Sequence, residues 1–229
     1  MKNTIIPKSS FDFLKTLAKN NEHEWFNKNK ARYLEELAHI TQFADVLLGL
    51  MNTHDHIETP SGKKSLHRIY KDTRFSKDKI PYKTNWSGNF KRATEKLRGG
   101  YYFHIEPGNS FAGGGFFAPN PGDLKRIRED ISWNHKEWRK ILSAKKFRET
   151  FGMLEGESVK SAPRGFAKDH PAIDLLRHKS FTIGHYFTDK EVLAPGFVKE
   201  LSNTFKAMRP FLDYMSEVLT TDSNGVNLV

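Results

Sequence analysis

Cysteine is absent from all 229 residues of the sequence. This excludes disulfide bonds, thiolate catalysis and every zinc or iron–sulfur site with a cysteine ligand. Long hydrophobic runs are also missing, because no stretch approaches the roughly 18 apolar residues that cross a bilayer. The opening residues, MKNTIIP, lack the apolar core of a signal peptide. We therefore expect a cytoplasmic protein with no signal peptide and no membrane partner.

Aromatic residues, in contrast, are plentiful. The chain contains 18 Phe, 7 Tyr and 4 Trp, and its hydrophobic residues amount to 37%. Over this length, such a content is enough to bury the core of one medium-sized domain. It also argues against disorder, although 28% of the residues are charged.

The positive charge is concentrated in one part of the chain. Residues 62–98, called here the basic segment, hold 12 Lys and Arg against 3 Asp and Glu, which accounts for +9 of the net charge of +10. A local excess of this kind indicates an anionic partner such as a phosphate, a carboxylate, a nucleic acid or an acidic protein face. The alternative is a solvated basic surface without a ligand.

Helical periodicity occurs on both sides of the middle of the chain. Ser9 or Ser10 is expected to cap the first helix. Asn120 is expected to cap a later helix whose first residue is Pro121. Asp169 is expected either to cap a short helix or to join a polar cluster. Pro210 is expected to kink or break the last helix near Arg209. The apolar spacing places helices around residues 13–18, 33–48, 124–131, 133–142, 173–176 and 197–219.

In the middle of the chain, the side chains alternate in character every second residue, as they do in β-strands. Alternation predicts strands over residues 66–71, 101–106, 111–118 and 180–187, and the turn residues 107–110 join two of them in a hairpin. Helices flank these strands without strand–helix alternation, which predicts an α+β fold with an antiparallel or mixed sheet. We expect a single domain over residues 10–219, a short extension over 1–9 and a flexible tail over 220–229.

The densest candidate binding site lies within the basic segment. Arginine can hold a carboxylate or phosphate through two hydrogen bonds, lysine adds charge, and tyrosine can stack on or orient a ligand. Internal pairing between Arg and Asp, which would only fix the shape of a loop, is the alternative. The predicted ligand-binding residues are Arg68, Tyr70, Lys71, Arg74, Lys77, Lys79, Tyr82, Lys83 and, from a second polar cluster, Arg164.

His104 and Glu106 are the candidate catalytic residues. The two-residue period puts both on one strand face with Tyr102, where a carboxylate can orient an imidazole for acid–base work near neutral pH. An ordinary hydrogen-bonded pair is the alternative. Gly113, Gly114 and Gly115 weaken the following strand, so either a bulge, a ligand or bulky neighbours should need their space. The two histidines at 54 and 56 are a weak signal for a metal, and we expect no metal and no cofactor.

Four stretches of the chain resemble a known family. They are residues 20–26 (NNEHEWF), 68–84 (RIYKDTRFSKDKIPYKT), 100–115 (GYYFHIEPGNSFAGGG) and 164–181 (RGFAKDHPAIDLLRHKSF). In this order they resemble the bacterial and fungal family catalogued as DUF2461, a domain of unknown function. Ile80 and His67 depart from the residues usual there. The resemblance implies a single domain, and it implies no reaction, cofactor or catalytic residue.

The leading hypothesis is a basic pocket that binds a small molecule bearing a phosphate or carboxylate, with the question of catalysis left open. Nucleic-acid binding through the same residues 62–98 is the alternative, because tyrosine and phenylalanine are interleaved with the basic residues. A basic face that docks an acidic protein is a third. The sequence does not indicate an oligomeric state.

Overall fold

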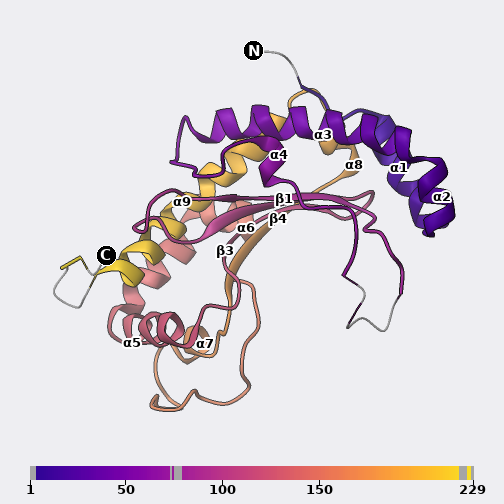
Figure 1. Ribbon diagram of the computed structural model, residues 1–229. Helices are drawn as coiled ribbons and strands as arrows, with labels where there is room; N and C mark the ends of the chain where they lie inside the picture. Colours follow the sequence, from indigo (N-terminus) through magenta and orange to yellow (C-terminus); the bar gives the residue numbers. More distant parts are fainter. Residues whose placement is uncertain (1–3, 73, 75–78, 222–225, 228–229) are drawn as a thin grey trace. The chain divides into compact units, whose positions relative to one another are not determined.

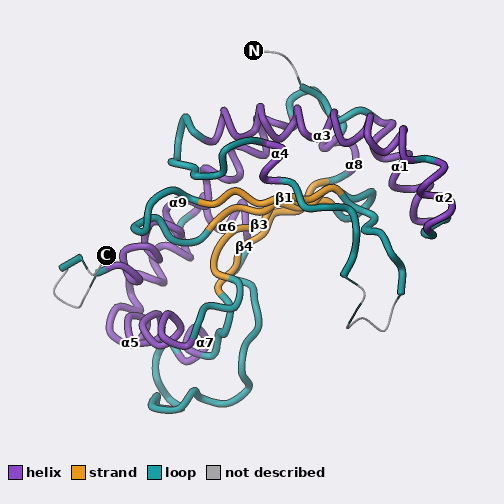
Figure 2. Tube along the Cα trace, viewed as in Figure 1, coloured by secondary structure: helices purple, strands orange, loops and turns teal. Residues whose placement is uncertain are grey.

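The computed structural model describes residues 4–72, 74, 79–221 and 226–227. Four strands form one antiparallel sheet in the order β1-β2-β3-β4, shown in orange in Figure 2. Helices precede and follow the strands along the chain, so the predicted α+β class is confirmed. The strands are β1 (Trp86–Lys91), β2 (Gly100–Ile105), β3 (Ser110–Phe116) and β4 (Phe181–Phe187).

The helices, labelled in Figure 1, fall mainly where the apolar periodicity predicts them. Within the described ranges, none is long and apolar enough to cross a membrane. The helices are α1 (Lys8–Lys19), α2 (His23–Lys28), α3 (Lys30–Met51), α4 (Gly62–Ser65), α5 (Pro121–Ser143), α6 (Lys145–Phe151), α7 (Ile173–Leu176), α8 (Asp189–Val192) and α9 (Phe197–Thr220).

The chain forms two compact units, and each is described by itself below. The first unit comprises Met1–Phe90, Tyr102–Ala112 and Tyr186–Asn203. The second comprises Lys91–Tyr101, Gly113–His185 and Thr204–Val229. The predicted limits of 1–9, 10–219 and 220–229 stay a prediction.

In the first unit, α3 packs beside α1 and α4, and its apolar side faces the sheet. Phe43 of α3 is fully buried and lies against the rings of Phe103 on β2 and Phe197. The start of α1 differs from the prediction, because its cap is Pro7 and neither serine caps it. Ser10 lies inside the helix, fully buried, where its hydroxyl donates to the Glu36 carboxylate at 2.7 Å.

The predicted hairpin over residues 101–118 is confirmed as β2 and β3. Gly108 adopts a φ of +78° in its turn, a conformation that glycine reaches without strain. On β2, Phe103 and Ile105 are buried, while Tyr102 and His104 alternate with them on the opposite, half-buried face. This alternation is what brings the candidate catalytic residues to an accessible surface.

The strand predicted over residues 66–71 is wrong. That segment makes only isolated antiparallel bridges, between Leu66 and Gly88 and between Tyr70 and Tyr82. The regular strand at this position is β1, which sequence analysis missed because glycine and asparagine are poor strand formers. Gly88 is nevertheless required there, since a Cβ would lie 2.8 Å from the Phe103 ring.

In the second unit, Asn120 caps α5 by accepting from the backbone of Asp123, and Pro121 begins it, as predicted. The two helices predicted over 124–142 are one helix with a kink at Asn134, where the backbone leaves helical geometry (φ −114°, ψ 25°). Of the two outcomes expected at Pro210, a kink or a break, the break is wrong, because α9 continues through this residue. Pro210 is on the exposed side of α9, so water can satisfy the carbonyl that the ring leaves without a partner.

Candidate functional site

Tyr102, His104 and Glu106 form a hydrogen-bonded row along the half-buried face of β2. The Tyr102 hydroxyl lies 3.1 Å from His104 Nδ1, and His104 Nε2 lies 2.9 Å from Glu106 Oε2. The side chains of His104 and Glu106 are 12% and 23% exposed. We call these three residues the Tyr–His–Glu row. The shared face follows from the two-residue period of the strand, as the sequence predicts.

Glu106 is held as a carboxylate by its neighbours. Burial alone would raise its pKa, but hydrogen bonds from His104, Thr84 and Asn109 outweigh that effect and lower the pKa. Thr84 Oγ1 donates to Glu106 Oε1 at 2.7 Å, and Asn109 Nδ2 donates to Oε2 at 3.2 Å. An ionised carboxylate only accepts, so His104 Nε2 carries the hydrogen of the bond between them.

The hydroxyl of Tyr102 determines the direction of the hydrogen bond at the other end of the row. Burial raises the pKa of its hydroxyl, a hydrogen bond with Ser87 lowers it, and the charge of Glu106 raises it again, with a net increase. The raised pKa keeps the proton on Tyr102 near neutral pH, and the hydroxyl can donate it to His104 Nδ1 when Nε2 carries the single ring hydrogen. The order of donors runs from Tyr102 through His104 to Glu106, the arrangement by which a carboxylate orients an imidazole.

Aromatic rings cover the row on one side. The Phe111 ring from β3 stacks on His104, with centroids 5.0 Å apart and an interplanar angle of 17°. Tyr186 from β4 lies 5.6 Å from Phe111 and is 63% exposed. A ligand on this face would therefore meet an apolar wall beside the polar row.

Residues 66–84 are called here the basic hairpin, because an antiparallel bridge joins Tyr70 to Tyr82. Thr84 connects this segment to the Tyr–His–Glu row. Backbone bonds of 2.8 Å link Lys71 N to Pro81 O and Lys83 N to Ile69 O. Burial, and then the charge of Arg68, lower the pKa of the Lys83 ammonium. Lys83 directly precedes Thr84, the residue that donates to Glu106, so the backbone at Lys83 is tied to the row through its neighbour.

The other predicted residues of the basic hairpin occupy several kinds of position. Tyr70 is 44% exposed, whereas Tyr82 is 1% exposed, stacks on Phe26 at 4.0 Å and lies with its hydroxyl 3.0 Å from His23 Nδ1. Tyr82 is thus a core residue, and we do not assign it a ligand contact. Lys71 and Lys79 are exposed, and Lys77 lies outside the described residues.

Several arginines of the basic segment pair with acidic residues. Arg74 donates from Nε and Nη2 to the Asp72 carboxylate at 2.9 and 2.6 Å, with both side chains exposed. In the second unit, Arg92 is fully buried and pairs with Asp213, while Arg98 pairs with Asp123 at 2.5 Å. Internal pairing within the loop, the alternative that the sequence left open, therefore applies to Arg74, whereas Arg92 and Arg98 pair with acidic residues outside the basic segment.

The polar cluster around Arg164 belongs to the second unit, where Arg164 is exposed. The short helix expected to begin at Asp169 starts only at Ile173, and its cap residue is Ala172, so the capping role of Asp169 is wrong. The ring of His170 accepts from the Ala172 backbone at 3.0 Å. This hydrogen bond lies just before α7, in the segment where the sequence predicts Asp169 to begin the helix.

The space beside two of the three glycines is filled by the chain itself. A Cβ at Gly114 would lie 2.5 Å from the Met208 sulfur, and one at Gly115 would lie 2.2 Å from the Phe181 carbonyl oxygen. Gly115 also has a φ of +123°. Close packing by α9 and β4, rather than room for a ligand, explains why glycine is needed at these two positions.

Sequence reasoning missed the residues that support the row. Thr84 ends the stretch 68–84 without standing out as a site residue, and Ser87 belongs to no motif. Only their contacts with Glu106 and Tyr102 reveal their role. Phe111 could have been found from the predicted hairpin, because residues just after a turn lie opposite those just before it. Within the described ranges, no group of three or more His, Asp or Glu side chains could hold a metal ion.

Comparison with known families gives one match. The profile described as "Conserved hypothetical protein (DUF2461)" covers residues 9–214 of the chain. No curated protein and no solved structure matches it. The match includes the basic hairpin, the Tyr–His–Glu row and both compact units.

Proposed function

Because the chain belongs to the DUF2461 family of conserved hypothetical proteins, whose description names no reaction, we propose its function from the site itself. The protein binds a small molecule that carries a phosphate or carboxylate, on the half-buried face of the first unit. The observation that carries this proposal is the oriented Tyr–His–Glu row, to which Thr84 bonds the end of the basic hairpin.

Lys83 is the central anion-binding residue of this proposal. Its ammonium is partly buried and close to the charge of Arg68, and both effects disfavour the charged form. Within the described ranges, no ion pair is found for Lys83. A bound anion would offset the repulsion between the two cations and part of the cost of burial. Exposed Lys71 and Lys79 add long-range attraction for the anion.

The row supplies a route for a proton. Tyr102 donates to His104, whose other nitrogen donates to the Glu106 carboxylate, so His104 can accept a proton while Glu106 stabilises the resulting imidazolium. A ligand hydroxyl at the Tyr102 end would pass its proton to the Tyr102 oxygen while Tyr102 passes its own proton to His104 Nδ1, so the row as a whole acts as the general base. Phe111 excludes water from one side of the imidazole.

The test is a thermal-shift screen of the full chain against phosphorylated and carboxylated metabolites. We expect some of them to stabilise the protein, since a ligand at 100 times its Kd adds about 2.7 kcal/mol to the free energy of unfolding. Lys83→Ala should weaken the binding of such a ligand about tenfold, because a charged hydrogen bond is worth about 1.5–3 kcal/mol. Lys63→Ala, which removes an exposed charge from the same segment, is the matched control.

Two results would overturn the proposal. One is a broad panel in which no anion stabilises the protein, and the other is an equal loss of binding in Lys83→Ala and Lys63→Ala. Nucleic-acid binding through residues 62–98 would give a third, distinct pattern. Its affinity would fall steeply and linearly with salt on logarithmic axes, and several lysines would contribute alike.

A further inference from the structure

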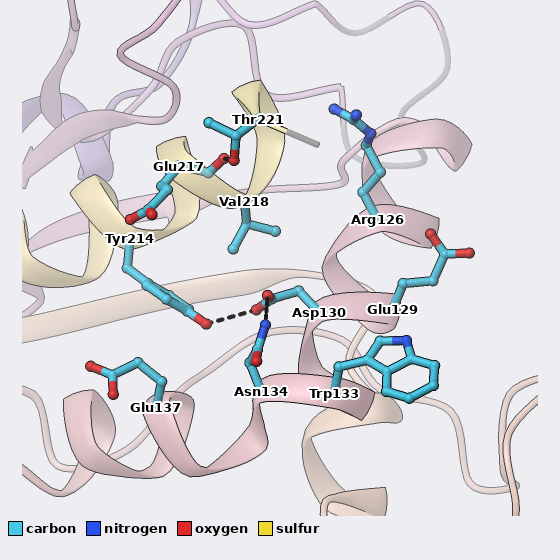
Figure 3. Close-up of a pocket in the computed structure, with 10 residues that line it drawn as sticks. All are labelled: Arg126, Glu129, Asp130, Trp133, Asn134, Glu137, Tyr214, Glu217, Val218 and Thr221. Atoms are coloured by element: carbon cyan, nitrogen blue, oxygen red, sulfur yellow. Dashed lines mark hydrogen bonds between the residues drawn. The ribbon is translucent and has the colours of Figure 1, made fainter. Parts of the chain in front are cut away.

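The second unit contains a cavity of about 810 Å³ between α5 and α9, drawn in Figure 3. Its volume is in the range of small-molecule sites, which span roughly 300–1,000 Å³. None of the residues that line it belongs to the anion site described above, and the proposal that follows does not rest on that site.

The lining of the cavity is acidic, although the whole chain carries a net charge of +10. Its single cationic side chain is Arg126, which donates from Nη1 to the Leu219 carbonyl oxygen at 2.9 Å at the edge of the cavity. A negative cavity in a positive protein selects its ligand by charge. The carboxylates are those of Glu129, Asp130, Glu137 and Glu217.

Asp130 is held in place by three neutral donors. The Trp138 indole donates to Oδ2 at 2.6 Å, the Tyr214 hydroxyl donates to the same oxygen at 2.8 Å, and Asn134 Nδ2 donates to Oδ1 at 2.7 Å. These bonds fix the carboxylate without neutralising its charge. Figure 3 shows Tyr214 reaching from α9 across to Asp130 on α5.

The phenol of Tyr214 reports the negative potential of the cavity. Burial raises its pKa most, followed by the hydrogen bond to Asp130 and then by the charges of Asp130, Glu137 and Glu217. Carboxylates from both helices therefore act at one point in the cavity, and a cation at that point would be attracted by all of them.

Trp133 supplies an aromatic surface at the same place. Its side chain is 84% exposed, in a chain whose other large aromatic residues are mostly buried. The kink at Asn134, the next residue, sets the direction of the chain here, and Asn134 is itself bonded to Asp130. An indole face attracts cationic groups through its quadrupole more strongly than the rings of Tyr and Phe do.

We propose that this cavity binds a linear polyamine. In Figure 3, Glu129 lies on one side of the cavity and Glu137 and Glu217 on the other, with Asp130 between them. Carboxylates spread in this way match several ammonium groups along one extended molecule, and the apolar links between those groups can lie against Trp133 and Val218. Each carboxylate on the way neutralises one charge of the ligand.

Calorimetric titration of the full chain with spermidine tests the proposal. We expect saturable binding of one molecule, and binding at least about tenfold weaker for butylamine, which has a single charge. The double variant Glu137→Gln/Glu217→Gln should weaken spermidine binding about tenfold or more. The control Glu95→Gln/Glu149→Gln removes the same charge from exposed positions that do not line the cavity, and should bind as the unmodified chain does.

The aromatic contribution is tested separately. Trp133→Ala should weaken spermidine binding about two- to fivefold, as expected for a cation–π contact at an exposed site, and Trp133→Phe should restore part of the loss because a ring face remains. Because Trp133 is exposed, both variants should fold, which circular dichroism checks. The proposal is overturned by an absence of saturable binding, by equal affinities for spermidine and butylamine, or by equal losses in the two double variants. It is also overturned if Trp133→Ala leaves the affinity unchanged.

Discussion

The Thr84 hydroxyl donates to the Glu106 carboxylate at 2.7 Å, although the two residues are 22 positions apart in the sequence. This bond links the end of the basic hairpin to the Tyr–His–Glu row. Lys83 is the residue directly before Thr84. The link between the basic hairpin and the row thus depends on a threonine that the sequence does not single out as a site residue.

Thr84→Val should therefore disturb the row while keeping the shape of the side chain. We expect a loss of about 1–2 kcal/mol in the free energy of unfolding, because a hydrogen bond to a charged group is lost. The Glu106 pKa should rise, since one of the bonds that lower it is removed. Chemical denaturation measures the stability, and carboxyl NMR measures the titration. In the double variant Thr84→Val/Glu106→Gln, additive losses would show that the two residues do not act through each other.

The stability of the first unit should depend on pH through Glu106. Its folded-state pKa lies below the ordinary value of 4.5. The stabilisation is then complete above the unfolded-state pKa and is lost as the pH falls through the folded-state pKa. Glu106→Gln should reduce the unfolding free energy relative to the unmodified chain at pH 7, and the difference should shrink towards pH 3. A difference that is constant over this range would contradict the predicted titration.

Arg92 should be the most important basic residue for stability. Its side chain is fully buried, pairs with Asp213 and donates from Nη1 to Ser216 Oγ at 3.2 Å. Arg92→Ala should cost about 3–5 kcal/mol, because it leaves a cavity in place of a fully buried side chain and removes its bonds to Asp213 and Ser216. Lys96→Ala, at an exposed position nearby in the sequence, should change stability by less than about 0.5 kcal/mol. Similar denaturation midpoints for the two variants would show that burial does not set the contribution of Arg92.

Arg92 also shows why the basic segment could not be interpreted fully from sequence. Counting charges over residues 62–98 identifies an excess, but the carboxylate of Asp213 is 121 positions away from Arg92. No local pattern predicts such a pair. The same holds for Thr84 and Glu106, whose contact exists only once the basic hairpin folds against the sheet.

Features that depend on neighbouring residues could be predicted. Alternation identified β2, β3 and β4, and Asn120 followed by Pro121 identified the start of α5. Where tertiary packing overrides local preference, the prediction failed. Gly88 lies in a strand because the Phe103 ring occupies the space of a Cβ there. Ser10 lies in a helix interior, where its hydroxyl donates to the buried Glu36 carboxylate.

Ser10 and Ser9 offer a matched pair of variants. Both hydroxyls donate to Glu36 Oε2, from Ser10 at 2.7 Å and from Ser9 at 3.2 Å. Glu36 is 3% exposed and Ser10 is fully buried, whereas Ser9 is exposed. Ser10→Ala should destabilise the protein by about 1–3 kcal/mol, because a buried carboxylate loses its shorter bond. Ser9→Ala should cost less than half as much, since water can replace its hydroxyl. Equal unfolding midpoints for both variants would contradict this ranking.

Gly115 and Gly49 should respond to alanine in opposite directions. At Gly115 the added Cβ would meet the Phe181 carbonyl oxygen at 2.2 Å, and the backbone already has a φ of +123°. Strain and overpacking together should cost about 3 kcal/mol. Gly49 lies exposed within α3, with nothing within 4 Å of the added Cβ, so alanine there should stabilise the helix by about 0.5–1 kcal/mol. Urea denaturation with the m-value held constant measures both changes. If Gly115→Ala left the midpoint unchanged, β3 would have to be free to move away from β4 at this position.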